Sequence, residues 1–184
     1  VASQREVLAD WERRFMHDAE RFGRPQRTAI SSAPLAPAGT VDLAILANNG
    51  HTLMADGATE RVFRDVFEAL RPGGIFGVEQ HSAASTGLQD PLAATGYVQE
   101  AYVRALAQEA GFEFVAASDV NANPHDTRDH PFGVWTLPPV LLTAPLGAEP
   151  DPEFDTTPYQ AIGESDRMTL RFRKPAAARQ ESQP

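Results

Sequence analysis

The sequence contains no cysteine, which excludes disulfide bonds, zinc sites with thiolate ligands and iron–sulfur clusters. It also has no uninterrupted apolar run of about eighteen residues, so we expect no segment that crosses a membrane. Basic residues are few, with 16 Lys and Arg against 25 Asp and Glu, and the net charge is −9. The basic residues are scattered along the chain or paired with acidic ones. This pattern argues against a nucleic-acid surface and favours a small-molecule or protein partner.

The sequence gives little information on the cellular compartment or the oligomeric state of the protein. The chain starts at Val1 with no initiator methionine and no signal peptide, and we expect further residues before it. The absence of cysteine does not separate the cytoplasm from the periplasm. The cytoplasm is therefore only the default expectation, secretion stays open, and so does a homodimer.

The length of 184 residues fits one domain, which we place at 1–175 with a flexible tail at 176–184. A proline-rich segment with little periodicity is expected to form an inserted cap at about 121–165. Its first part, 121–142, is apolar enough to be ordered, and 143–158 is expected to be flexible.

Hydrophobic periodicity predicts an alternation of helices and strands. Three segments have apolar residues at helical spacing: 3–22, 58–70 and 97–110. Five segments are predicted strands: 27–31, 41–47, 75–80, 112–120 and 167–174. The alternation indicates βαβ units and a largely parallel sheet, and the period of two in the last strand predicts an antiparallel or edge position.

Two of these strands end in polar residues. Asn48, Asn49 and His51 follow the first, and Glu79 and His81 end the second. Because ligands of open α/β sheets bind beyond the carboxyl ends of parallel strands, both groups are expected on one rim. Period two places Glu79 and His81 on the same side, where a carboxylate would orient the imidazole and raise its pKa. We therefore predict His51 or His81 as general base or ligand clamp, with Glu79 orienting His81.

The expected cap adds further polar and aromatic candidates for ligand binding: Asn123, His125, His130 and Trp135. For any single candidate, a helix cap, a loop hydrogen bond or core packing is an equally good explanation. A metal site built from the histidines and Glu79 lacks a spacing such as HExxH, so we predict no metal. Ser-His-Asp hydrolysis lacks the GxSxG turn.

Four stretches together resemble the second half of class I S-adenosylmethionine-dependent methyltransferases: "VDLAILANNGH", "LRPGGIFGVEQHS", "EAGFEFVAASDV" and "ESDRMTLRFRKP". "EQHS" and "NANPHDTRDHPFGVWTLPP" are similar, more narrowly, to bacterial predicted methyltransferases of unassigned substrate. The resemblance extends from about Glu20 to Pro175. It implies a Rossmann-like, seven-stranded sheet with helices on both faces, in which our five strands are the third to the seventh and the last is antiparallel.

The resemblance also implies S-adenosylmethionine as cofactor and a small-molecule oxygen or nitrogen as methyl acceptor. The residues placed to touch the cofactor are Ser32, Ala33, Ala47 and Asn48. The acceptor would lie near Asn49, His51, Glu79 and His81. The family's first strand and its GxGxG turn have no counterpart here, so we expect that the amino-terminal cofactor-binding portion is missing from the chain.

Two other functions stay open on the sequence alone. The chain could be a methyltransferase-like fragment that serves as a non-catalytic binding or dimerisation module. It could also be a metal-dependent hydrolase or lyase that uses the histidine cluster.

Overall fold

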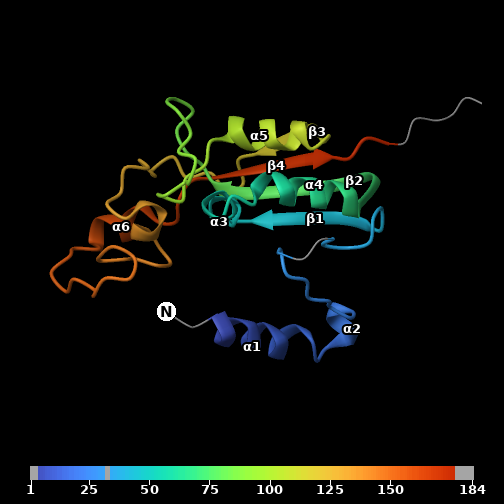
Figure 1. The fold of residues 1–184 in the computed structure, drawn as a ribbon. Coiled ribbons are helices and arrows are strands. Elements are labelled where there is room, and N and C mark those ends of the chain that lie inside the picture. The colour runs from blue at the N-terminus through green and yellow to red at the C-terminus, as the bar shows by residue number, and fades with distance from the viewer. Residues whose placement is uncertain (1–3, 32–33, 177–184) are drawn as a thin grey trace, which may run out of the picture. The chain divides into compact units, whose positions relative to one another are not determined.

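The computed structural model describes residues 4–31 and 34–176 (Figure 1). The described residues divide into two compact units, one within 1–33 and one within 34–184, and the single domain expected over 1–175 stays a prediction. The sheet and all strands of the described residues belong to the second unit. None of the described helices is both long and apolar enough to cross a membrane.

The first unit contains two helices, α1 (Gln4–Phe15) and α2 (Ala19–Phe22). The single helix expected over 3–22 is wrong, because the Asp18 side chain accepts a hydrogen bond from the Arg21 N–H (3.0 Å) and so starts a new helix. The strand expected over 27–31 is also wrong. Residues 27–31 form no ladder in the structure, and an isolated strand has no partner for its backbone groups.

The second unit is built on a four-stranded sheet. Its strands are β1 (Val41–Ala47), β2 (Leu70–His81), β3 (Glu113–Ser118) and β4 (Arg167–Arg173), in the spatial order β1-β2-β4-β3. β1 and β2 are parallel, and β4 runs antiparallel to both of its neighbours. The expected Rossmann-like sheet with a reversed last strand is confirmed, with four of the five predicted strands in the described residues.

Three helices cover one face of the sheet: α3 (Gly50–Ala55), α4 (Thr59–Ala69) and α5 (Glu100–Glu109). Their apolar side chains meet alternate residues of the strands, and Phe63 of α4 packs edge-on against Phe76 of β2 at 5.2 Å. Two short helices, η1 (Gly133–Thr136) and α6 (Thr157–Ile162), lie in the segment predicted as a cap. α3 was not predicted.

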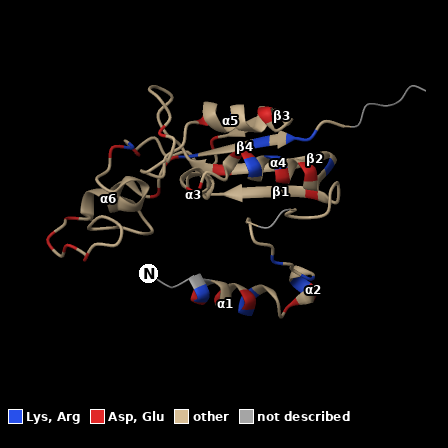
Figure 2. Cartoon of the chain, in the orientation of Figure 1, with Lys and Arg blue, Asp and Glu red and all other residues tan. Residues whose placement is uncertain are grey.

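The opposite face of the sheet carries apolar residues that no helix of 34–176 covers. Leu43 is 55% exposed and Ile45 is 69% exposed, and they line a hollow of about 460 Å³. Helices on both faces were expected for the whole chain, and within the described part of this unit the helices cover one face. Charges of both signs are mixed along the helices, whereas the loop before α6 carries acidic residues (Figure 2).

Candidate functional site

A cavity of about 310 Å³ lies beyond the carboxyl ends of β1 and β2. The two strands end together, because Ala47 pairs with Glu79 and the Asn48 N–H donates to the Glu79 carbonyl oxygen (2.8 Å). Polar and aromatic side chains from four parts of the chain line the cavity: Asn48, His51, His81, Trp135, Glu164, Ser165 and Arg167. Val134, Pro138, Pro139 and Val140 complete the wall. The common rim predicted from the sequence is therefore present.

His51 is held in the first turn of α3 by a side chain that our site prediction did not include. Gln80 is fully buried on the helix-covered face of β2, and its Nε2 lies 3.2 Å from His51 Nδ1. Its Oε1 accepts the Gly50 N–H at 2.8 Å, and its Nε2 donates to the Gly96 carbonyl at 2.9 Å. A Cβ on Gly50 would come within 2.9 Å of Gln80 Oε1, so a larger residue there would displace the Gln80 amide. Gln80 thus sets the position of His51.

His81 has Ser165 as its hydrogen-bond partner. The distance from His81 Nδ1 to Ser165 Oγ is 2.6 Å, and the His51 ring lies 5.6 Å away. Burial lowers the pKa of His81 to about 4, with His51 and Arg167 adding to the decrease and Asp126 opposing it. Burial also lowers the pKa of His51. Both imidazoles are therefore neutral at pH 7.

The prediction that Glu79 orients His81 is wrong. Glu79 was expected to orient His81 and to raise its pKa, but its carboxylate accepts a hydrogen bond from Arg167 Nη1 (2.9 Å). Arg167 stands opposite His81 in the β2–β4 ladder and therefore reaches the neighbouring carboxylate. Its Nη2 binds Glu164. Arg167 was missed because no local pattern shows which residue of β4 lies opposite His81.

Two polar atoms at the cavity are buried and have no hydrogen-bond partner among the described residues. One is the Oδ1 of Asn48 and the other is the Nε of Arg167. Asn48 also has a positive φ of 49°, which is uncommon outside glycine. Buried polar atoms without partners are costly, so these two are candidates for ligand contacts.

Trp135 is the one cap candidate that lines the cavity, and its ring meets His51 edge-on at 5.7 Å. His130 is buried elsewhere and binds Asp126 at 2.7 Å. Asn123 donates to the carbonyls of Ile162 (2.9 Å) and Glu164 (2.6 Å), and His125 is exposed. These three side chains do not line the cavity.

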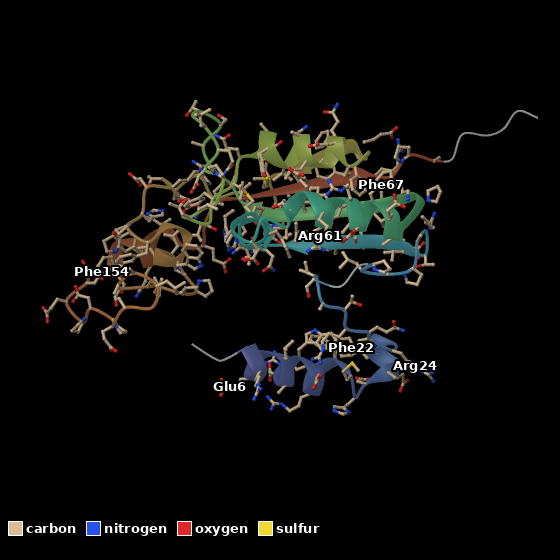
Figure 3. All side chains as sticks on the ribbon, viewed as in Figure 1. Glu6, Phe22, Arg24, Arg61, Phe67 and Phe154 are labelled. Atoms are coloured by element: carbon tan, nitrogen blue, oxygen red, sulfur yellow. The ribbon has the colours of Figure 1, made fainter. Side chains whose placement is uncertain are left out.

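Asp126 holds the cap onto the sheet. Its carboxylate accepts hydrogen bonds from the Tyr97 hydroxyl (2.9 Å) and the Asp166 N–H (2.8 Å), in addition to His130. The outer cap has an aromatic pair of its own, in which Phe154 (Figure 3) stacks on Tyr159 at 5.5 Å. The cap is therefore ordered by buried polar and aromatic contacts.

The remaining predicted site residues are not seen to line the cavity. Asn49 is exposed, and its side chain donates to the Ala47 carbonyl (2.9 Å) and does not line the cavity. Ala47 ends β1 beside the cavity rim. Ser32 and Ala33 lie outside the described residues. Within 4–31 and 34–176, no three His, Asp or Glu side chains are grouped so that they could hold a metal ion.

Comparison with known proteins identifies the fold. No family model and no curated protein matches the chain. Among solved structures, the cyclase SpnF matches 94% of this chain with a TM-score of 0.53 and 18% identity. A SAM-dependent methyltransferase from Methanosarcina mazei matches 96% with a TM-score of 0.53 and 12% identity. A possible exported protein from Bordetella parapertussis matches 93% with a TM-score of 0.52 and 16% identity.

The chain therefore has the fold of class I S-adenosylmethionine-dependent methyltransferases, as its sequence suggested. It spans 62% of the cyclase, 51% of the exported protein and 80% of the Methanosarcina mazei enzyme. At these identities the matches define the fold, and the residues of the cavity have to define the chemistry.

Proposed function

We propose that the protein is an S-adenosylmethionine-dependent methyltransferase. Its methyl acceptor would be an oxygen or nitrogen of a small molecule bound in the cavity lined by His51 and His81. The observation that carries the proposal is the cavity itself, which lies beyond the carboxyl ends of two parallel strands of a methyltransferase-type sheet. Its volume of about 310 Å³ is in the range of small-molecule sites.

The residues of the cavity rim fit one side of the cofactor. The buried Oδ1 of Asn48 has no partner and can accept a hydrogen bond from an N–H or O–H group. Ala47 next to it has a small side chain that leaves the strand end open to a ligand. Ser32 and Ala33 stay cofactor contacts implied by the family resemblance alone. When bound, S-adenosylmethionine supplies an electrophilic methyl carbon.

The chain's own residues would align the acceptor and receive its proton. His81 is neutral at pH 7, so its imidazole can accept a proton from the acceptor as the new bond to carbon forms. Ser165 orients the ring through Nδ1, which leaves Nε2 for the acceptor. Trp135 forms an aromatic wall, and Glu79 acts indirectly by holding Arg167. Asn123 and His130 support the site through the cap, and we assign Asn49 and His125 no direct contact.

Calorimetry with S-adenosylhomocysteine tests cofactor binding, and transfer of a labelled methyl group to a panel of small phenols, enols and heteroaromatic amines tests the reaction. Replacing the base, His81→Ala, should lower turnover by about a hundredfold and leave the heat of cofactor binding unchanged. The exposed His125→Ala variant is the matched control and should retain full turnover. Absence of binding heat from a chain that carries the expected first strand and GxGxG turn would contradict the proposal and favour a non-catalytic module. Equal loss of binding and turnover in His81→Ala would contradict the role of His81.

A further inference from the structure

The side-chain amide of Gln80 can adopt only one orientation. Its Oε1 lies 2.8 Å from the Gly50 N–H, which can only donate, and its Nε2 lies 2.9 Å from the Gly96 carbonyl, which can only accept. A flipped amide would set donor against donor and acceptor against acceptor in a fully buried site. The hydrogen-bond network therefore determines which end of the amide faces His51.

This orientation determines where the proton of His51 sits. The Nε2 of Gln80 carries two hydrogens, one for the Gly96 carbonyl and one for His51 Nδ1 at 3.2 Å. Because Gln80 donates, His51 Nδ1 must be the unprotonated nitrogen of a neutral ring. The ring proton is then on Nε2, the nitrogen that Gln80 does not contact.

We propose that Gln80 is a positioning residue that locks His51 as an Nε2–H donor, and that the cavity binds its small molecule through a neutral carbonyl or hydroxyl oxygen. The Nε of Arg167 is a second donor in the same wall, buried and without a partner. The guanidinium charge of Arg167 is already matched by Glu79 and Glu164, so the wall offers no surplus positive charge to an anion. Trp135 and Pro138 provide flat apolar surfaces for the rest of the ligand.

The inference refines the proposed function and rests on it only in taking the ligand to be the methyl acceptor. A hydrogen bond donated to the reacting atom would occupy its lone pair and weaken it as a nucleophile. The oxygen bound by His51 is therefore a neighbour of the reacting atom, and His81 is left as the proton acceptor. A carbonyl next to the reacting O–H or N–H also acidifies it, which suits the weakly basic imidazole of His81. The acceptor class is thus an enol, phenol or heteroaromatic N–H that lies beside a carbonyl or hydroxyl group.

Long-range proton–nitrogen NMR of the imidazole rings tests the first half in the protein alone, with no cofactor. The spectrum should show His51 protonated on Nε2. In Gln80→Glu the new side chain, once ionised at high pH, can only accept, so Nδ1 of His51 should become protonated. A wild-type His51 protonated on Nδ1 would overturn the proposal, and so would an unchanged tautomer in a folded Gln80→Glu variant. The wild-type spectrum decides the tautomer even if Gln80→Glu does not fold.

Three fragment probes test the second half: acetophenone, ethylbenzene without the oxygen, and benzoate with a charge. Acetophenone should shift the His51 resonances saturably and bind at least about fivefold more tightly than the other two, because one hydrogen bond is gained. His51→Phe should abolish this preference. Equal binding of ethylbenzene, or tighter binding of benzoate, would overturn the proposed ligand class. If the fragment probes behave as expected but the protein does not bind the cofactor, the methyltransferase proposal is contradicted and the proposed ligand class stands.

Discussion

The low pKa of His81 predicts how the stability of the protein depends on pH. An unfolded chain binds a proton on this histidine near pH 6.5, whereas burial in the folded state holds the pKa at about 4. Above pH 6.5 neither state binds the proton and stability is complete. Below pH 6.5 only the unfolded state binds it, so the free energy of unfolding decreases as the pH falls toward 4 and then levels off.

The size of the effect follows from the shift. A difference of about 2.5 pH units at about 1.36 kcal/mol per unit gives an upper limit of about 3.4 kcal/mol between pH 6.5 and 4. Solvent that reaches the cavity would reduce this figure. The loss is a large fraction of the stability of a typical domain, about 5–15 kcal/mol.

Urea unfolding at pH values from 8 to 4 should be compared for the wild type and His81→Gln. Glutamine does not titrate and can still hydrogen-bond Ser165, so it is a matched control for the histidine. Carboxylates titrate in both proteins, and the difference between the two curves isolates His81. The wild type should lose up to about 3.4 kcal/mol more than the variant. Parallel curves, or an NMR titration that places the pKa of His81 near 6.5, would refute the reasoning.

Three further changes test the packing around the site. Gly96→Ala should lower the free energy of unfolding by about 1–3 kcal/mol, because the new Cβ would lie 2.4 Å from Val134 Cγ2 and the residue has a positive φ. Adding Val134→Ala should recover part of this loss, as measured by urea unfolding. Asp126→Ala should cost about 3 kcal/mol and expose the cap to proteolysis, since it leaves the buried donors Tyr97 and the Asp166 N–H without their acceptor; intact protease resistance would contradict this. Phe76→Ala should cost about 3–5 kcal/mol, whereas Ile45→Ala on the uncovered face should stay within about 0.5 kcal/mol; similar losses would show that Ile45 is covered.

The strands were predictable where apolar residues form an unbroken run or recur at every second position. β1 coincides with the predicted 41–47 because its apolar run is bounded by polar and glycine-containing segments. β4 was recognised by Met168, Leu170 and Phe172, which all face the core. The break between α1 and α2 was missed because a single side chain, Asp18, competes with continued helix.

The rim of the site was predictable, but the partners within it were not. Chain order places His51 and His81 after strand ends, which is a local signal. The pairing of Glu79 with Arg167 depends on β4 lying next to β2, and nothing local to either strand encodes that neighbour. Gln80 was unrecognisable as a positioning residue, because a buried glutamine in a strand looks like an exception to the apolar pattern until its contacts are known.

The position of β4 has a consequence for biosynthesis. β4 is the last of the four strands to leave the ribosome, yet it is inserted between β2 and β3, and β3 has no other partner in the sheet. The nascent chain must therefore keep β3 and one edge of β2 unpaired until residues 167–173 have emerged. Ser165 and Arg167 arrive with that strand, so the ligand cavity is completed only at the final step of assembly.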